Sequence, residues 1–424
     1  MIKPNKLMFR IWTFCSFLWF FLPFQLLKTD FSNFGFVVLI AFILFFILGG
    51  QLANKSKMSS FKNYSYDVKF SLSIIALISI IATVFLIFES QGKLTISLAD
   101  AYISRSNAAQ GLLYGDVSNS SIYFKVAFLT YPAGYVYLAL GILFLKKINF
   151  FKLTLFGLLP ISLSAFAMGG RVQLFYAILV IFLSLSLRKK YWEILGVEKL
   201  NKFRWTIKKM FIALILFTTL IVTSIYFVNV FFARAESVGG SEGMFKVAET
   251  IWGIGFRGAL SNFLFEIFSI DIIFIVFMFS WYLSQGLVMS NIIFEGYDGP
   301  LQLGVYGVEI ISAIVRRFDG TIIYNNFQSL MDLGTYGFLP SAFGSLFIDF
   351  HFFGLIISFL WGWWSTKVYR KTINLSVKSM LLYPFMIIGI ILSIINTPIG
   401  MTNGLITFFW LFTAYFFIKK QKTI

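Results

Sequence analysis

The chain has 424 residues, of which 58% are hydrophobic and 12% charged, and its formal net charge is +17. This hydrophobic fraction, with a mean hydropathy of +0.84, excludes a water-soluble globular protein. In a soluble protein such a charge would indicate nucleic-acid binding. Here we attribute it to cytoplasmic loops beside anionic lipid headgroups, and we expect no nucleic-acid partner. The only cysteine, Cys15, excludes an intrachain disulfide.

Ten apolar segments are each long enough, at about 20 residues, to cross a bilayer as a helix. In chain order they are residues 7–27, 31–50, 70–88, 122–145, 153–168, 172–187, 211–232, 339–363, 380–395 and 403–418. The sequence therefore predicts an all-α fold, a polytopic transmembrane helix bundle that forms one integral membrane domain over residues 1–424.

The basic residues predict the orientation of this bundle. Of the 35 Lys and Arg residues, 25 lie in the two termini and in connectors 55–69, 146–152, 188–209 and 367–378. Only three of the 18 acidic residues share those places. Short loops rich in Lys and Arg stay in the cytoplasm. We therefore expect both termini and these connectors to be cytoplasmic.

Two regions are then expected on the external side. The first, residues 89–121, is polar and rich in Ser, Asn and Gly. The second, residues 233–338, contains ten acidic and five basic residues. Loops of this length usually carry function, so the second region is where we expect the functional site.

Residues 267–289 complicate this count, because they are apolar enough to span on their own. A single crossing there would place the later basic residues outside, whereas a second crossing near residues 304–315 would restore the parity. The turn between them, residues 291–300, holds two acidic residues and no basic one. The sequence favours a re-entrant or interface-lying helix within the external region, and twelve spans remain the alternative.

Arginines outside the cytoplasmic segments predict an anion site. Arg171 follows Gly169 and Gly170 between two apolar segments, at a membrane edge where an arginine can hold a phosphate bidentately. The alternative is an arginine that extends to the interface from a helix end. Four residues form the candidate diphosphate site, although each alone could be a surface charge: Arg171, Arg234, Arg257 and Arg316.

Three residues are candidates for a catalytic base. His351, the only histidine, and Asp349 lie in the predicted span 339–363, where ionisable residues are functional candidates by default. A polar pair that stabilises the bundle is the alternative. Residues that are two positions apart in one helix lie about 200° apart around its axis, so at most one of these two is expected to face a substrate. We favour His351 as the base, with Asp349 more structural and the loop residue Glu242 as an alternative.

Several stretches resemble the bacterial O-antigen polymerases. They are Gly169-Gly170-Arg171 at the start of a helix, Gly334-Thr335-Tyr336-Gly337, and Phe343-Gly344-Ser345-Leu346-Phe347-Ile348-Asp349-Phe350 followed by Gly354. The late external region adds to the likeness. Those polymerases often show an aspartate-Phe-Gly run that leads into a late span, and this chain has His351 in place of that glycine.

This resemblance implies a multi-pass enzyme of the bacterial inner membrane. It would join oligosaccharide repeat units linked to undecaprenyl diphosphate into O-antigen or a related surface polysaccharide at the periplasmic face. A chain-length regulator would be a partner. The sequence has no D-x-D pair, so we expect an inverting glycosyltransferase without a metal or other cofactor. An O-antigen ligase and a lipid-linked oligosaccharide flippase remain alternatives.

Overall fold

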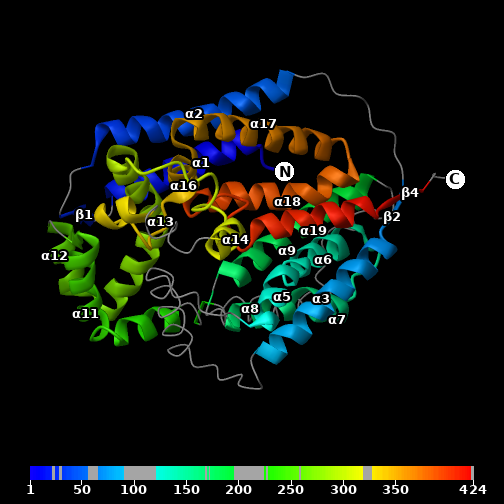
Figure 1. Cartoon of the computed structure of the whole chain (residues 1–424), viewed down its shortest axis with the longest axis horizontal. Coiled ribbons are helices and arrows are strands. Elements are labelled where there is room, and N and C mark those ends of the chain that lie inside the picture. Colours follow the sequence, from blue (N-terminus) through cyan, green and yellow to red (C-terminus); the bar gives the residue numbers. More distant parts are fainter. Residues whose placement is uncertain are drawn as a thin grey trace.

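The structure is a computed structural model that describes residues 1–21, 24–27, 31–55, 65–89, 121–167, 170, 172–194, 224–225, 228–256, 259–318 and 327–421. Helices dominate it, which confirms the predicted all-α fold (Figure 1). Its described strands have three residues each. Strand β1 (Phe24–Leu26) pairs antiparallel with β3 (Ile254–Phe256), and β2 (Ser65–Asp67) pairs antiparallel with β4 (Lys419–Gln421).

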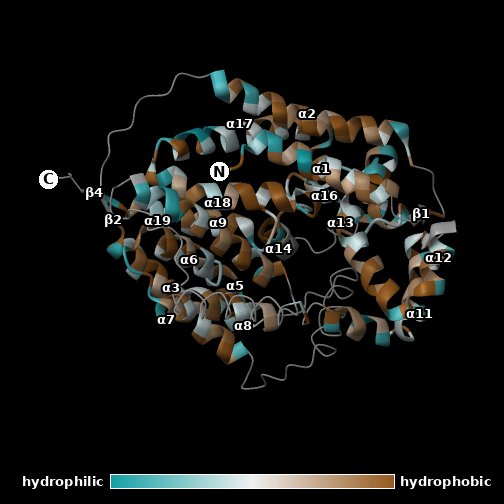
Figure 2. Cartoon of the chain, turned by 180° about the vertical axis from the view of Figure 1, so that it is seen from behind, coloured by the Kyte–Doolittle hydropathy of each residue, from teal (hydrophilic) through white to brown (hydrophobic). Residues whose placement is uncertain are grey.

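Eight helical segments in the described part are long and apolar enough to cross a membrane. They are α2 (Asn33–Lys55), α3 (Lys69–Glu89), α5 and α6 (Ile122–Thr130, Ala133–Phe144), α7 to α8 (Phe150–Ala167), α9 (Val172–Ile194), α13 (Ile270–Gly296), α16 and α17 (Ser341–Phe350, Gly354–Ile373) and α18 (Val377–Ile391) with a 3-10 turn (Leu392–Ile394). Figure 2 shows that these helices are hydrophobic over most of their length. The chain is therefore a polytopic membrane protein, as predicted.

Three predicted spans differ from the helices found. Helix α1 (Pro4–Phe21) is shorter than predicted and is not among the eight, because Asn5, Lys6 and Arg10 lower its hydropathy. Helix α19 (Gly404–Phe416) is apolar but has only 13 residues. Most of the predicted span 211–232 lies outside the described residues.

The remaining helices belong to the predicted external region. They are α11 (Gly240–Val247), which runs into a π-helical turn (Ala248–Trp252), α12 (Ala259–Ile267) and α14 (Glu309–Phe318). Residues 228–236 and 327–332 are also helical. This region therefore has secondary structure of its own, consistent with a folded loop rather than a simple connection.

The basic connectors of the described part lie together at one end of the bundle. Arg370 near the end of α17 donates to the carbonyl oxygen of Ala53 near the end of α2. Arg188 donates to the carbonyl oxygen of Leu145 at 2.6 Å. The pairing of β2 with β4 brings the C-terminal segment to the connector that precedes α3. The charge distribution in the sequence thus corresponds to one physical end of the molecule.

Helices α2 and α17 lie side by side and run parallel (Figure 1). A Cβ atom on Gly362 would collide with the backbone oxygen of Phe46, and one on Gly49 would collide with that of Phe359. Small residues let two membrane helices approach until their backbones touch, and dispersion contacts then stabilise the pair. This pair therefore fixes where α17 begins and, with it, the turn that precedes α17.

Helix α13 is one continuous helix of 27 residues, with its last turns beside the start of α2 (Figure 1). Asn291 exchanges two hydrogen bonds with the backbone of Ser32, at 2.8 and 2.9 Å. Phe294 stacks on Phe42 with ring centroids 5.6 Å apart. The helix thus ends at the end of α2 that lies away from the basic connectors. Whether it is re-entrant or spans stays a prediction.

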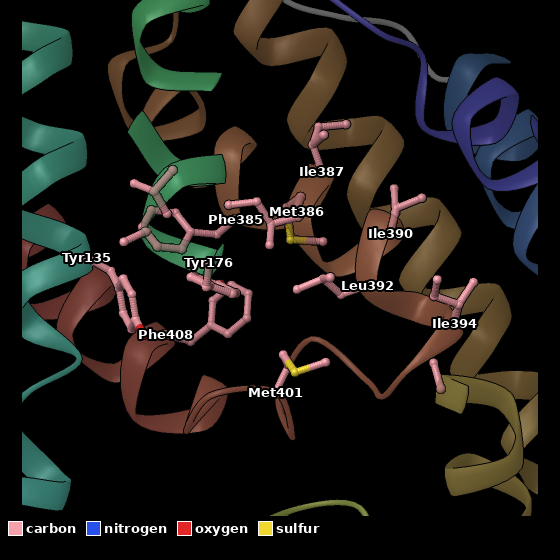
Figure 3. Close-up of a cluster of buried hydrophobic side chains, with 14 of the residues drawn as sticks. Tyr135, Tyr176, Phe385, Met386, Ile387, Ile390, Leu392, Ile394, Met401 and Phe408 are labelled. Atoms are coloured by element: carbon pink, nitrogen blue, oxygen red, sulfur yellow. The ribbon is translucent and has the colours of Figure 1, made fainter. Parts of the chain in front are cut away.

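A buried aromatic cluster joins α6, α9, α18 and α19 (Figure 3). The rings of Tyr135 and Tyr176 lie 4.8 Å apart, and Tyr176 also contacts Phe385. Close by, the Tyr131 hydroxyl donates to the carbonyl oxygen of Thr402 at 3.1 Å. The cluster therefore holds the loop between α18 and α19 at the end of the bundle opposite the basic connectors.

Candidate functional site

The candidate site lies at a break between α16 and α17. Helix α16 ends at Phe350, and a 3-10 turn (His351–Phe353) leads into α17. His351 has φ 46° and ψ −135°, a backbone conformation that glycine adopts readily and that other residues rarely adopt. The predicted span 339–363 largely overlaps Ser341–Ile373, which is long and apolar enough to cross a membrane, but it consists of two helices joined at this break rather than one continuous helix.

Asp349 anchors the loop of residues 297–308 to this break. Its Oδ1 accepts the backbone N–H of Tyr306 at 3.0 Å, and its Oδ2 accepts that of Gly307 at 2.8 Å. Its own carbonyl oxygen accepts the N–H of Leu303 at 2.9 Å. A Cβ on residue 307 would lie 2.6 Å from Oδ2, so this close approach requires glycine. Asp349 thus holds the loop both through its buried carboxylate, which accepts from Tyr306 and Gly307, and through its backbone carbonyl oxygen, which accepts from Leu303.

His351 contacts the same loop with its imidazole. Its Nε2 lies 3.0 Å from the carbonyl oxygen of Gly299. A carbonyl oxygen only accepts hydrogen bonds, so Nε2 carries the proton, and in the neutral ring Nδ1 then holds a free lone pair. The rings of Tyr297 and Phe347 flank the imidazole at 5.5 and 5.3 Å. The half-buried ring is therefore oriented, with Nδ1 as the atom that can accept a proton.

The expectation that Asp349 and His351 point to different sides is wrong. It assumed one helix through both residues, whereas α16 ends between them. Both side chains bind the loop of residues 297–308, Asp349 near its end and His351 near its start. The break in the helix therefore brings together two residues that a continuous helix would separate.

Three residues of this loop contribute to the site without having been predicted. Gln302 is buried and donates to the Tyr297 hydroxyl at 3.2 Å. Burial raises the pKa of Tyr306, and the nearby Asp349 carboxylate raises it further. Burial also raises the pKa of Tyr297, against the hydrogen bond from Gln302. Both phenols therefore stay protonated at neutral pH, and the Tyr297 hydroxyl donates to the carbonyl oxygen of Pro300 at 2.9 Å.

The loop of residues 297–308 also touches the loop between α18 and α19. A Cβ on Gly400 would collide with the backbone oxygen of Gly307, so the two backbones are in direct contact. Glu309, which follows the loop, lies close enough to interact electrostatically with Tyr131. The site is thus continuous with the tyrosine-rich end of the α6–α9 core.

The structure does not bring the other predicted site residues to the α16–α17 break. Arg234 donates from Nη1 to the Tyr282 hydroxyl on α13 at 2.7 Å. Glu242 lies exposed in the first turn of α11. Arg171 and Arg257 lie outside the described residues, and Arg316 lies in α14 but its side chain is not described. The diphosphate site therefore stays a prediction, whereas Asp349 and His351 are brought to one loop.

The described side chains contain no group of three or more His, Cys, Asp or Glu residues that could hold a metal ion. The chemistry available at the break is that of an oriented imidazole, a buried carboxylate and two protonated phenols. Comparisons of the chain with protein-family models, with curated proteins and with solved structures find no match.

Proposed function

We propose that this chain is a membrane-embedded polymerase of lipid-linked oligosaccharides. It joins repeat units carried on undecaprenyl diphosphate at the periplasmic face of a bacterial inner membrane. The observation that carries the proposal is the α16–α17 break, where His351 is held with Nδ1 free to accept a proton. This break lies at the end of α17 away from the basic connectors, which we infer to be cytoplasmic.

The proposed reaction requires one proton acceptor and one anion site. A hydroxyl of the incoming lipid-linked repeat attacks the anomeric carbon of the growing chain, and its proton passes to His351 Nδ1. The bond from that carbon to the lipid diphosphate breaks, and configuration at the carbon inverts because one displacement occurs. The guanidinium groups of Arg171, Arg234, Arg257 and Arg316 would stabilise the departing diphosphate in place of a metal.

In this proposal Asp349 positions the site rather than reacting. Both of its oxygens already accept backbone N–H groups, and the side chain is only 3% exposed. It therefore keeps the loop of residues 297–308 beside His351. Glu242, exposed on α11, is the alternative base if the external helices close over the break.

Deleting the gene in its host tests the proposal. A strain without the polymerase should make lipopolysaccharide with a single repeat unit, seen on a gel as one band above the bare core. Loss of that first band as well would indicate the ligase or the flippase, because a repeat reaches the core only if both are present. An unchanged ladder of bands would reject all three functions.

A further inference from the structure

In the loop of residues 297–308, apolar side chains are exposed and a polar side chain is buried, which is the reverse of the arrangement that water favours. Leu301 and Leu303 are 45% and 67% exposed, whereas Gln302 between them is 2% exposed and binds the Tyr297 hydroxyl. A loop in water normally presents its glutamine and buries its leucines, because exposed apolar surface is unfavourable there.

The turn between α16 and α17 shows the same reversal. The polar residue of the turn, His351, points to the carbonyl oxygen of Gly299 and is partly buried. Phe352 and Phe353, which follow it, are 52% and 67% exposed. The hydrogen bond from Leu303 N to Asp349 O ties the two reversed segments together. We call Leu301, Leu303, Phe352 and Phe353 the outer apolar patch.

The outer apolar patch continues into the exposed face of α17. Phe353, Ile356 and Leu360 are spaced by three and four residues, which places them on one face of the helix, and all three are exposed. No Asp, Glu, Lys or Arg lies between Asp349 and Lys367. This face belongs to a segment long and apolar enough to cross a membrane, so its surroundings are acyl chains.

We propose that the outer apolar patch is inserted into the acyl chains of the bilayer, in the leaflet opposite the basic connectors. Continuity with the exposed face of α17 identifies the bilayer as the occupant. The loop of residues 297–308, which its position in the external region would place in water, then penetrates the membrane surface. The inference stands without the proposed reaction, because it concerns only what surrounds these four side chains.

The proposal has a consequence for access to the break. Asp349 and the Gly299 carbonyl are held next to the patch residues, because Leu303 donates to the Asp349 carbonyl oxygen and His351, which precedes Phe352, contacts Gly299. A molecule with an acyl or isoprenoid chain could therefore reach the break from within the leaflet.

Nitroxide accessibility in proteoliposomes tests the patch directly. In a Cys15→Ala background, single cysteines replace Leu303 and Phe353, both exposed and therefore tolerant of substitution, with Leu301 and Phe352 as second positions. Each is spin-labelled, and its collision rates with oxygen and with a water-soluble nickel chelate are measured. Ile356 is the matched control on the helix face, and the exposed Glu236 is the control in the external region.

The proposal expects the ratio of oxygen to nickel collisions at Leu303 and Phe353 to match Ile356 and to exceed Glu236 several-fold. High nickel accessibility at the patch would show that it lies in water and would overturn the proposal. Protection from both reagents would also overturn it, because the patch would then be covered by protein, such as a second copy of this chain. The elution profile of each labelled variant shows that it is folded.

Discussion

At the residue scale, the buried carboxylate of Asp349 gives the first prediction. Asp349→Asn replaces one accepting oxygen by an NH2 group, which cannot accept the N–H of Tyr306 or of Gly307. One backbone donor is then left unsatisfied, at a cost of about 1 to 3 kcal/mol. We expect the free energy of unfolding in mixed micelles to fall by that amount. Asp332→Asn, at an exposed position, is the control and should change little.

The backbone conformation of His351 allows its two roles to be separated. His351→Gly removes the imidazole and relieves a conformation that costs non-glycine residues about 1 to 3 kcal/mol, whereas His351→Ala removes the imidazole and keeps the strain. If the imidazole is the base, both variants lose chain extension by about 100-fold or more. The glycine variant should nevertheless be the more stable of the two. Normal polymer from the glycine variant at matched expression would remove His351 from the chemistry.

The sequence singles out Asp349 and His351 as candidates but does not predict the geometry in which the structure places them. Asp349 and His351 stand out because ionisable residues are rare in an apolar segment. Their partners do not stand out. Tyr306 lies 43 positions before Asp349 and Gly299 lies 52 positions before His351, in a region without a periodic pattern. The positive φ of His351 is likewise not predictable from the sequence, since glycine rather than histidine adopts it readily.

At the element scale, the contact between α2 and α17 predicts a strong effect of a small substitution. Gly362→Ala adds one methyl group where the backbone of Phe46 already touches the helix. Overpacking of this kind costs about 1 to 3 kcal/mol or forces the helices apart. We expect a lower unfolding free energy and reduced chain extension, since α17 carries the break. Ile356→Ala on the exposed face of the same helix should have a much smaller effect on both.

Helix boundaries follow from hydropathy only where lipid is the main environment. The sequence locates both ends of α3 and the starts of α2 and α9 within two residues, whereas α2 and α9 continue past their predicted ends into the basic connectors. It does not locate the end of α16, because that helix is buried on all sides and its residues read as a continuous span with α17. The same limit applies to α13, whose last turns are buried against α2 and α16.

At the scale of the whole molecule, the gathering of basic connectors at one end predicts the response to a membrane-impermeant thiol reagent. A cysteine at Ser237, exposed after the helix of residues 228–236, should be labelled in intact cells. A cysteine at Asn374, exposed just after α17, should be labelled only after lysis. The reverse labelling pattern would invert the orientation.

The central claim is that this membrane bundle itself extends lipid-linked chains, and reconstitution tests it most directly. The purified full-length protein is placed in liposomes with lipid-linked single repeats from the deletion strain and no lipopolysaccharide core. The account predicts a ladder of longer lipid-linked chains and release of undecaprenyl diphosphate, both lost in His351→Gly. Repeats that stay single until lipopolysaccharide core is added would contradict it and indicate a ligase.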